Sequence, residues 1–306
     1  MSWAGIRIGP PSGGTRSGES RHDASMTLAG YEVHPIETGR FRLDGGAMFG
    51  VVPKALWSGT NPPDERNRIE LAARALLISG RGRTILVDNG NGSKFTEKQT
   101  DIYRVDTSGT ELTRSLRAHG LDPSDITDVI LTHLHFDHAG GSTLRENGAL
   151  RPAFPKARYY VQRAHWNHAL APSEKDRGSF MPDDFMPLKD HGVLDFVDGE
   201  CELFPGISLV VINGHTTSLQ LPFISDGSAS LLFCCDLFPT TSHIPLPYIM
   251  AYDLRPLVTL EEKKKILPRA SEEGWLLFFE HDPRVIAGRV KRTEKGFQLD
   301  SSAGWE

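Results

Sequence analysis

The chain has 306 residues, of which 39% are apolar, enough to build a buried core in one layered domain. Its 34 basic and 39 acidic residues give a net charge of −5, which offers no general attraction to nucleic acid or to an anionic membrane surface. No stretch approaches the roughly 20 consecutive apolar residues that a membrane-spanning helix requires. The composition therefore argues against a nucleic-acid-binding or membrane protein and predicts a soluble one.

The start of the chain, residues 1–26, is predicted to be a disordered tail. Residues 10–14 read PPSGG, and the Ser, Arg and Glu residues around them show no hydrophobic periodicity. Because residues 1–29 lack the apolar stretch of a secretory signal, we expect a cytoplasmic protein, with Met26 as an alternative start. Three cysteines are an odd and sparse set that agrees with a reducing compartment. Residues 27–306 are predicted to form one domain.

Strands and helices are predicted to alternate along this domain. The early strands are expected near residues 32–36, 47–52, 73–79 and 84–88. Residues 109–120 read as a helix because Leu112 and Leu116 are four positions apart and Gly120 supplies a C-terminal stop. A buried strand ending at Thr132, a helix over 163–171 and a cleft-covering loop over 172–187 follow. The alternation suits an α/β fold, a four-layer αββα sandwich.

Residues 133–141 read HLHFDHAGG and place four metal-binding side chains, His133, His135, Asp137 and His138, within six positions. They follow a short apolar run, so we expect them on a loop at the end of a strand. Alternate side chains of an extended segment point the same way, so the first two histidines can reach one ion and Asp137 and His138 a second. Such a cluster, without cysteine, favours a hydrolytic site over a structural one or an ion-free surface loop.

Three further side chains could complete two coordination spheres. Each follows an apolar run that is predicted to be a strand, so each should lie at a strand end on the same rim of the fold. They are His215 after residues 209–212, Asp236 after residues 231–235, and His281 after residues 275–280. In this interpretation the neighbouring Cys235 points away from the metals and packs in the core.

The motifs HLHFDHAGG, NGHTT, CCDLF and FFEHDP together resemble the metallo-β-lactamase superfamily over about residues 30–285. The resemblance implies a metallo-β-lactamase sandwich and a hydrolase domain over residues 27–306. It implies one metal held by His133, His135 and His215, a second held by Asp137, His138 and His281, and Asp236 as the bridge. It also implies that Asp88 braces the metal loop. Zinc is the default for two divalent ions per chain, and manganese, cobalt or iron would fit the same donors.

The expected chemistry is hydrolysis by an activated water. Two ions a few ångströms apart lower the pKa of a shared water, so that hydroxide can attack an electrophilic centre near neutral pH. Asp137 and Asp236 are the candidate catalytic carboxylates, with Asp137 placed to carry the proton to the leaving group. An ester, a lactone, an amide or a phosphoester would all suit such a centre.

Residues 236–253 most resemble the YtnP-like quorum-quenching N-acyl-homoserine lactonase branch of the superfamily, which implies a small-molecule lactone or ester substrate. That branch's best-known members carry a tyrosine three residues after the bridging aspartate, where this chain has Pro239, so Tyr248 or Tyr252 would have to substitute. Packing is the alternative role for both tyrosines. The candidate substrate contacts are Met48, Phe49, Phe238, His243, Tyr248 and Tyr252.

Two other functions stay open at this point: an organophosphate (phosphotriester) hydrolase, and a persulfide dioxygenase that uses a single iron. A homodimer is also left open. His165 and His168 are interpreted as histidines on the outside of a helix beside Trp166 rather than as ligands. The run of lysines at 263–265 is interpreted as a solvated helix face rather than as a phosphate-binding patch.

Overall fold

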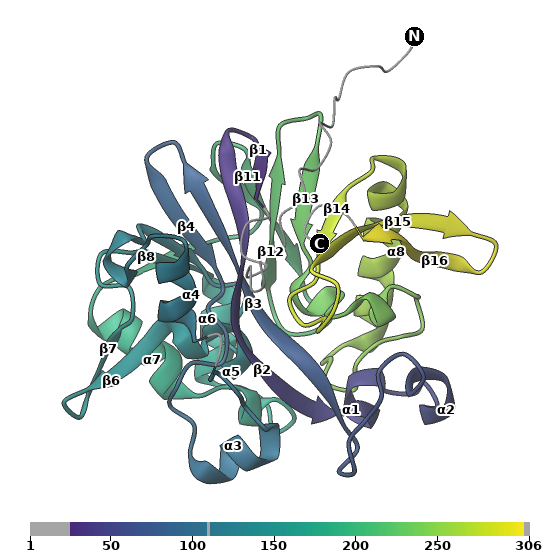
Figure 1. The fold of residues 1–306 in the computed structure, drawn as a ribbon, viewed down its shortest axis with the longest axis horizontal. Coiled ribbons are helices and arrows are strands. Elements are labelled where there is room, and N and C mark those ends of the chain that lie inside the picture. The colour runs from purple at the N-terminus through teal and green to yellow at the C-terminus, as the bar shows by residue number, and fades with distance from the viewer. Residues whose placement is uncertain (1–24, 109–110, 303–306) are drawn as a thin grey trace, which may run out of the picture.

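A computed structural model describes residues 25–108 and 111–302 of the chain (Figure 1). Two β-sheets pack face to face in it and helices cover their outer faces, which confirms the predicted four-layer αββα arrangement. The predicted tail lies outside the described residues except for its last two positions, and Met26 already begins the first strand. None of the helices in the described ranges combines the length and the apolar character that crossing a bilayer needs.

The first sheet is built from the N-terminal part of the chain. In spatial order its strands are β1 (Met26–Leu28), β2 (Tyr31–Asp44), β3 (Arg68–Gly80), β4 (Arg83–Val87), β5 (Asp128–Ile130), β8 (Arg158–Gln162) and β9 (Leu194–Val197). From β4 onward neighbouring strands are parallel. The loops that follow β4 and β5 therefore leave the sheet at the same edge.

The second sheet is built from the rest of the chain. Its strands are, in order, β10 (Cys201–Phe204), β11 (Ile207–Ile212), β12 (Leu219–Ser225), β13 (Ser230–Phe233), β14 (Leu276–Phe278), β15 (Ala287–Thr293) and β16 (Gly296–Ser302). Only β13 and β14 pair in parallel among them, with Phe233 beside Phe278, so these two strands also end side by side. A separate hairpin consists of β6 (Thr143–Glu146) and β7 (Ala149–Pro152).

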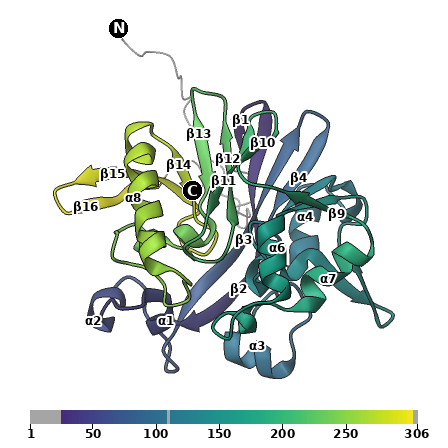
Figure 2. The same cartoon turned by 180° about the vertical axis from the view of Figure 1, so that it is seen from behind.

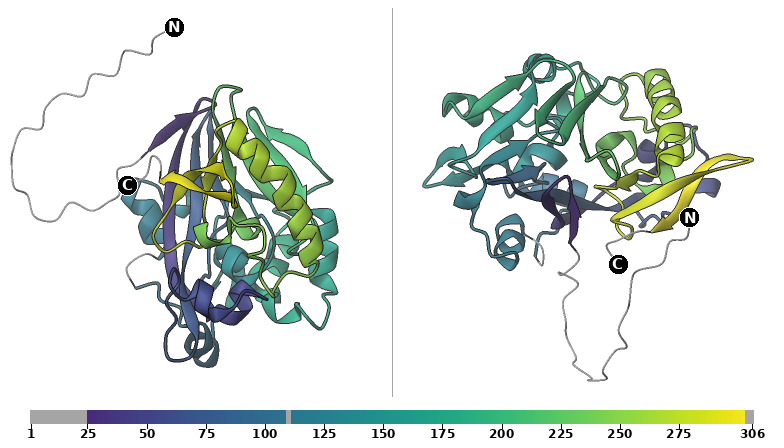
Figure 3. Two further views of the ribbon diagram at one scale, coloured as in Figure 1. Left: turned by 90° about the vertical axis from the view of Figure 1, so that its right-hand side faces the viewer. Right: turned by 90° about the horizontal axis from the view of Figure 1, so that it is seen from above.

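Helices form the two outer layers (Figures 2 and 3). The α-helices are α1 (Gly45–Phe49), α2 (Lys54–Trp57), α3 (Glu97–Tyr103), α4 (Leu112–Ala118), α5 (Phe136–Ala139), α6 (Arg163–Leu170), α7 (Pro182–Asp190) and α8 (Pro256–Glu272). The 3-10 turns are η1 (Pro123–Asp125), η2 (Gly140–Ser142), η3 (Arg177–Ser179), η4 (Cys235–Leu237) and η5 (Thr241–His243). The longest helix, α8, covers the second sheet, while α4, α6 and α7 cover the first.

Alternation along β3 explains why the first sheet can be covered on both faces. Leu76 and Ile78 point into the core between the two sheets, whereas Ala75 and Leu77 point into the core beneath the helices. A strand has a side-chain period of two, so a continuous apolar run supplies both cores at once. This run was the basis of the strand predicted over residues 73–79, which the structure confirms and extends to Arg68–Gly80.

Two predicted elements were wrong. Residues 47–52 do not form a strand, because Asp44 caps a short helix by accepting a hydrogen bond from the backbone N–H of Ala47 (2.8 Å). The predicted loop over residues 172–187 becomes helical from Pro182, and Phe185 of that helix packs on Trp166. Proline fits the first turn of a helix, where its missing N–H has no partner to lose.

Candidate metal centre

The seven predicted metal ligands lie together at the ends of strands from both sheets. His133 and His135 follow β5, Asp137 and His138 lie in α5, and His215, Asp236 and His281 follow β11, β13 and β14. All seven side chains are buried. They form two groups whose donor atoms lie within 4.8 Å of one another, His133–His135–His215–Asp236 and Asp137–His138–His281. This grouping matches the two ligand sets that the resemblance implies.

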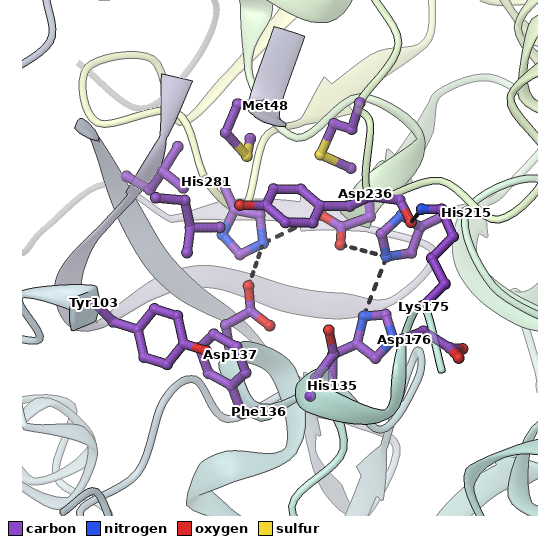
Figure 4. Close-up of a pocket in the computed structure, with 16 residues that line it drawn as sticks. Met48, Tyr103, His135, Phe136, Asp137, Lys175, Asp176, His215, Asp236 and His281 are labelled. Carbon is purple, nitrogen blue, oxygen red and sulfur yellow. Dashed lines mark hydrogen bonds and ion pairs between the residues drawn. The ribbon is translucent and has the colours of Figure 1, made fainter. Parts of the chain in front are cut away.

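The carboxylate of Asp236 lies between the two groups (Figure 4). Its Oδ2 is 2.9 Å from Nε2 of His215 in the first group and 3.4 Å from Nε2 of His138 in the second. Its Oδ1 is 3.3 Å from Nε2 of His281. One carboxylate can thus reach both groups, which is the arrangement that a bridging ligand needs.

The donor atoms fit a pair of divalent cations. Nε2 of His281 faces Nε2 of His138 at 3.1 Å, and Nε2 of His215 faces Nδ1 of His135 at 3.2 Å. Nε2 of His133 is buried with no hydrogen-bond partner. Burial lowers the pKa of His133 and of His135 well below the usual range, so both rings are neutral. Neutral imidazole nitrogens that converge in a buried space are suited to metal coordination.

Hydrogen bonds from the second ring nitrogens fix the orientation of three of these histidines. Nδ1 of His281 donates to the carbonyl oxygen of Ala72 (2.8 Å), and Nδ1 of His215 donates to Oδ1 of Asp253 (2.9 Å). Nδ1 of His138 lies 3.1 Å from Oδ2 of Asp88. A proton on Nδ1 of each ring would leave Nε2 to direct its lone pair at the centre. Neighbouring carboxylates outweigh burial and raise the pKa of His138, His215 and His281, so a bound ion would have to displace a proton from Nε2 of each ring.

The loop that carries Asp137 and His138 is braced by the loop after β4. Asp88, expected to act as a brace, accepts hydrogen bonds from the backbone N–H (2.8 Å) and the hydroxyl (2.6 Å) of Thr132. The two loops also touch at Gly140, where an added Cβ would lie 2.2 Å from the carbonyl oxygen of Asn91. Only glycine permits this close backbone approach.

A cavity of about 270 Å³ opens onto the two ligand groups (Figure 4). Of the predicted substrate contacts, Met48 and Tyr252 line this cavity. Four residues of the segment 172–187, which we expected to shape the pocket, also contribute to its wall: Lys175, Asp176, Gly178 and Ser179. The lining residues are Leu43, Met48, Leu71, Tyr103, His135, Phe136, Asp137, Lys175, Asp176, Gly178, Ser179, His215, Asp236, Met250, Tyr252 and His281.

The other four predicted substrate contacts do not line the cavity. Phe49 stacks between Trp57 and His243, and Tyr248 packs edge-on against the same phenylalanine. His243 is used internally, because its Nε2 donates to the carbonyl oxygen of Met48 (2.9 Å). Phe238 is buried in the core between the sheets. Nearness in sequence to Asp236 was therefore a poor guide to the cavity.

Three side chains near the site were assigned wrongly from sequence. His165 is not on the outside of its helix: it is fully buried, and its Nε2 accepts a hydrogen bond from the backbone N–H of Leu134 (2.8 Å). Cys235 does not point away from the ligands, because its Sγ lies 3.7 Å from Nδ1 of His138. A left-handed backbone conformation at Cys235 (φ 45°) turns the chain there out of the strand. Lys263 is buried rather than solvated.

Sequence reasoning also missed cavity residues, chiefly Tyr103, Phe136 and Lys175. Tyr103 stacks on Phe136 with ring centroids 4.6 Å apart. Burial raises the pKa of Tyr103, and the nearby charge of Asp137 raises it further. Burial also raises the pKa of Tyr252. The cavity therefore presents two protonated tyrosines beside a carboxylate.

Comparisons with known proteins agree with this geometry. A sequence model of the metallo-beta-lactamase superfamily matches residues 69–281. An N-acyl homoserine lactonase of Bacillus thuringiensis is 29% identical over 229 residues, which cover 70% of this chain and 82% of that protein. The crystal structure of a probable metal-dependent hydrolase from Staphylococcus aureus is 30% identical, has a TM-score of 0.82, and the match covers 90% of this chain and 97% of that one. A structure of an N-acyl homoserine lactone hydrolase with its product N-hexanoyl-L-homoserine bound at the catalytic metal centre is 25% identical, with a TM-score of 0.63 and coverage of 84% and 95%.

Proposed function

Because the chain belongs to the metallo-beta-lactamase superfamily and is a metal-dependent hydrolase, we propose that it is a dinuclear lactonase that opens N-acyl-homoserine lactones. The proposal of two metal ions is supported by the position of Asp236 between the two groups of buried candidate ligands. The lactone substrate is supported by the similarity to an N-acyl homoserine lactonase and to a hydrolase holding an acyl-homoserine product.

The metal site would be formed by the seven clustered ligands, with zinc as the default ion. Two such ions, when bound, supply a water of lowered pKa and polarise the substrate carbonyl. The chain's own contribution starts with Asp137, whose carboxylate lines the cavity and lies 3.7 Å (Oδ2) from Nε2 of His281. Asp137 accepts a proton from the attacking water and delivers it to the ring oxygen that departs when the lactone C–O bond breaks.

The remaining groups of the cavity would orient the lactone. The hydroxyl of Tyr252 stays protonated at neutral pH, since burial raises its pKa, so it can donate a hydrogen bond to a substrate carbonyl. Tyr103 is available for the same purpose. Leu43, Leu71 and Met250 give the cavity apolar wall area that suits an acyl chain.

The proposal is tested by elemental analysis of the purified protein together with turnover of three substrates: an N-acyl-homoserine lactone, an aryl ester and an aryl phosphotriester. We expect about two metals per chain and a preference for the lactone. A preference for the phosphotriester would replace lactonase by organophosphate hydrolase. One iron per chain, no hydrolysis and oxygen consumption with a persulfide would refute a hydrolase and favour the dioxygenase alternative.

Two pairs of variants sharpen this test. Asp236→Asn should lower both metal content and turnover, whereas Asp300→Asn, at an exposed ion pair with Lys291, should leave both unchanged. Tyr252→Phe should lower lactone turnover at full metal content, and Tyr248→Phe, outside the cavity, should not. Full metal content and activity in Asp236→Asn would rule out the bridging role.

A further inference from the structure

Residues 243–252, here called the wall segment, supply two side chains to the wall of the cavity. Met250 and Tyr252 of this segment line the cavity directly. Beyond the single 3-10 turn that ends at His243, the wall segment contains neither a helix nor a strand. Its position therefore does not come from the hydrogen-bond ladder of a sheet or a helix and has to be fixed by other bonds.

Lys263 of α8 holds the N-terminal part of the wall segment. Its Nζ donates hydrogen bonds to the carbonyl oxygens of His243 (2.7 Å), Pro245 (2.8 Å) and Tyr248 (2.9 Å). The side chain is fully buried, and no ion pair within the described ranges includes it. The carbonyl oxygen of Leu246 also lies 3.5 Å from Nζ, so four backbone acceptors surround the group. Burial lowers the pKa of Lys263 to about 7, and the hydrogen bonds stand on the geometry of these carbonyls. Their loss would leave buried acceptors unpaired, which is costly.

His243 links Lys263 to helix α1. His243, whose carbonyl oxygen binds Lys263, donates from Nε2 to the carbonyl oxygen of Met48 (2.9 Å). Its Nδ1 accepts from the hydroxyl of Thr240 (2.8 Å), and burial lowers its pKa to about 4, so the ring is neutral. Met48 also lines the cavity. Lys263 therefore acts on two parts of the cavity wall.

Lys175 holds the C-terminal end of the wall segment. Its Nζ donates to the carbonyl oxygens of Ala251 (2.6 Å) and Tyr252 (3.1 Å), and the lysine itself lines the cavity (Figure 4). It lies in the segment between α6 and α7. This segment is tied to α6 by Asp176, which accepts a hydrogen bond from His168 (2.6 Å). Unlike Lys263, Lys175 is exposed.

We propose that Lys263 and Lys175 are positioning residues that determine acyl-chain selectivity by fixing the wall segment at its two ends, Lys263 at residues 243–248 and Lys175 at residues 251–252. This inference rests on the proposed lactonase function for its substrate, and on the hydrogen bonds alone for the positioning. Neither lysine touches a predicted metal ligand directly. Their loss should therefore change which acyl chains fit, while the metal content remains the same.

The positioning is tested without any substrate by hydrogen exchange of the wall segment, followed by mass spectrometry. Lys263→Met keeps the length of the side chain but removes its donors, and it should speed exchange in residues 243–252 by about tenfold. Lys264→Met is the matched control, because this neighbouring lysine is exposed and pairs with Glu261. Lys175→Met supplies the same test at an exposed position should Lys263→Met fail to fold. Exchange as slow as in the unaltered protein would overturn the proposal.

Selectivity is tested with N-butanoyl, N-hexanoyl and N-decanoyl homoserine lactones. We expect the ratio of kcat/KM between the longest and the shortest chain to change by about tenfold in both lysine variants, at full metal content. An equal fall for all three chains would indicate general damage and overturn the selectivity role. If the unaltered protein hydrolyses none of them, the lactonase proposal fails, and the exchange experiment still decides whether the lysines fix the wall segment.

Discussion

Asp253→Asn should weaken metal binding although Asp253 is not one of the predicted ligands. The Asp253 carboxylate accepts hydrogen bonds from Nδ1 of His215 (2.9 Å) and from the hydroxyl of Thr259 (2.6 Å). An amide keeps the shape but offers one acceptor oxygen for these two donors. If its N–H groups face His215, the ring must move its proton to Nε2, which then loses the lone pair directed at the centre.

The expected cost is about 10–100-fold in metal affinity, or about 1.4–2.7 kcal/mol, the range seen when the hydrogen-bond partner of a metal-binding histidine is lost. Competition with a chromophoric chelator measures this affinity. Thr259→Val is the matched control, because it removes the other donor to Asp253 and leaves the acceptor of His215 in place. Affinity in Asp253→Asn within about twofold of the unaltered protein would refute the argument.

Three further results are expected. Phe233→Ala, in the core between the sheets, should lower the free energy of unfolding by about 3–5 kcal/mol in urea melts, while Leu257→Ala, 77% exposed, should change it by less than about 0.5 kcal/mol. Gly140→Ala should displace the metal loop and lower metal content in elemental analysis, whereas Gly59→Ala, with open space around it, should not; equal metal content in both would contradict the close approach. The pKa of Asp64 is lowered to about 2, because hydrogen bonds from Arg68 and Arg66 outweigh the effect of its burial. The ionised carboxylate therefore stabilises the folded protein above pH 3.8, and this contribution is lost as pH falls toward 2. Asp64→Asn should flatten the dependence of the free energy of unfolding on pH in this range.

The clustering of the seven candidate ligands could be predicted from sequence because each of these residues is marked by a local signal. A strand that ends in a histidine or an aspartate needs only its own apolar run to be recognised, and parallel pairing then brings β4 beside β5 and β13 beside β14. The fold class followed from the same runs. Once the strands pair, the residues that follow them are brought together, so no additional sequence signal is needed to predict the cluster.

The cavity could not be predicted in this way, since its wall is assembled from segments far apart in the chain. Tyr103 and Lys175 lie in connections whose course depends on the layers beneath them. The burial of Lys263, by contrast, left a usable signal. It lies four residues after Thr259 and three and four before Ile266 and Leu267, so it falls on the buried stripe of α8 rather than in a solvated run of lysines.

The division of the sheets along the chain has a consequence for how the protein becomes active during synthesis. Residues 25–197 supply every strand of the first sheet and residues 201–302 every strand of the second. Four of the seven predicted ligands belong to the earlier portion and three to the later one. A nascent chain that has released only its first portion cannot assemble both ion sites, whatever its degree of folding. If the seven residues are the metal ligands, as proposed, the protein gains activity only once His281 has left the ribosome.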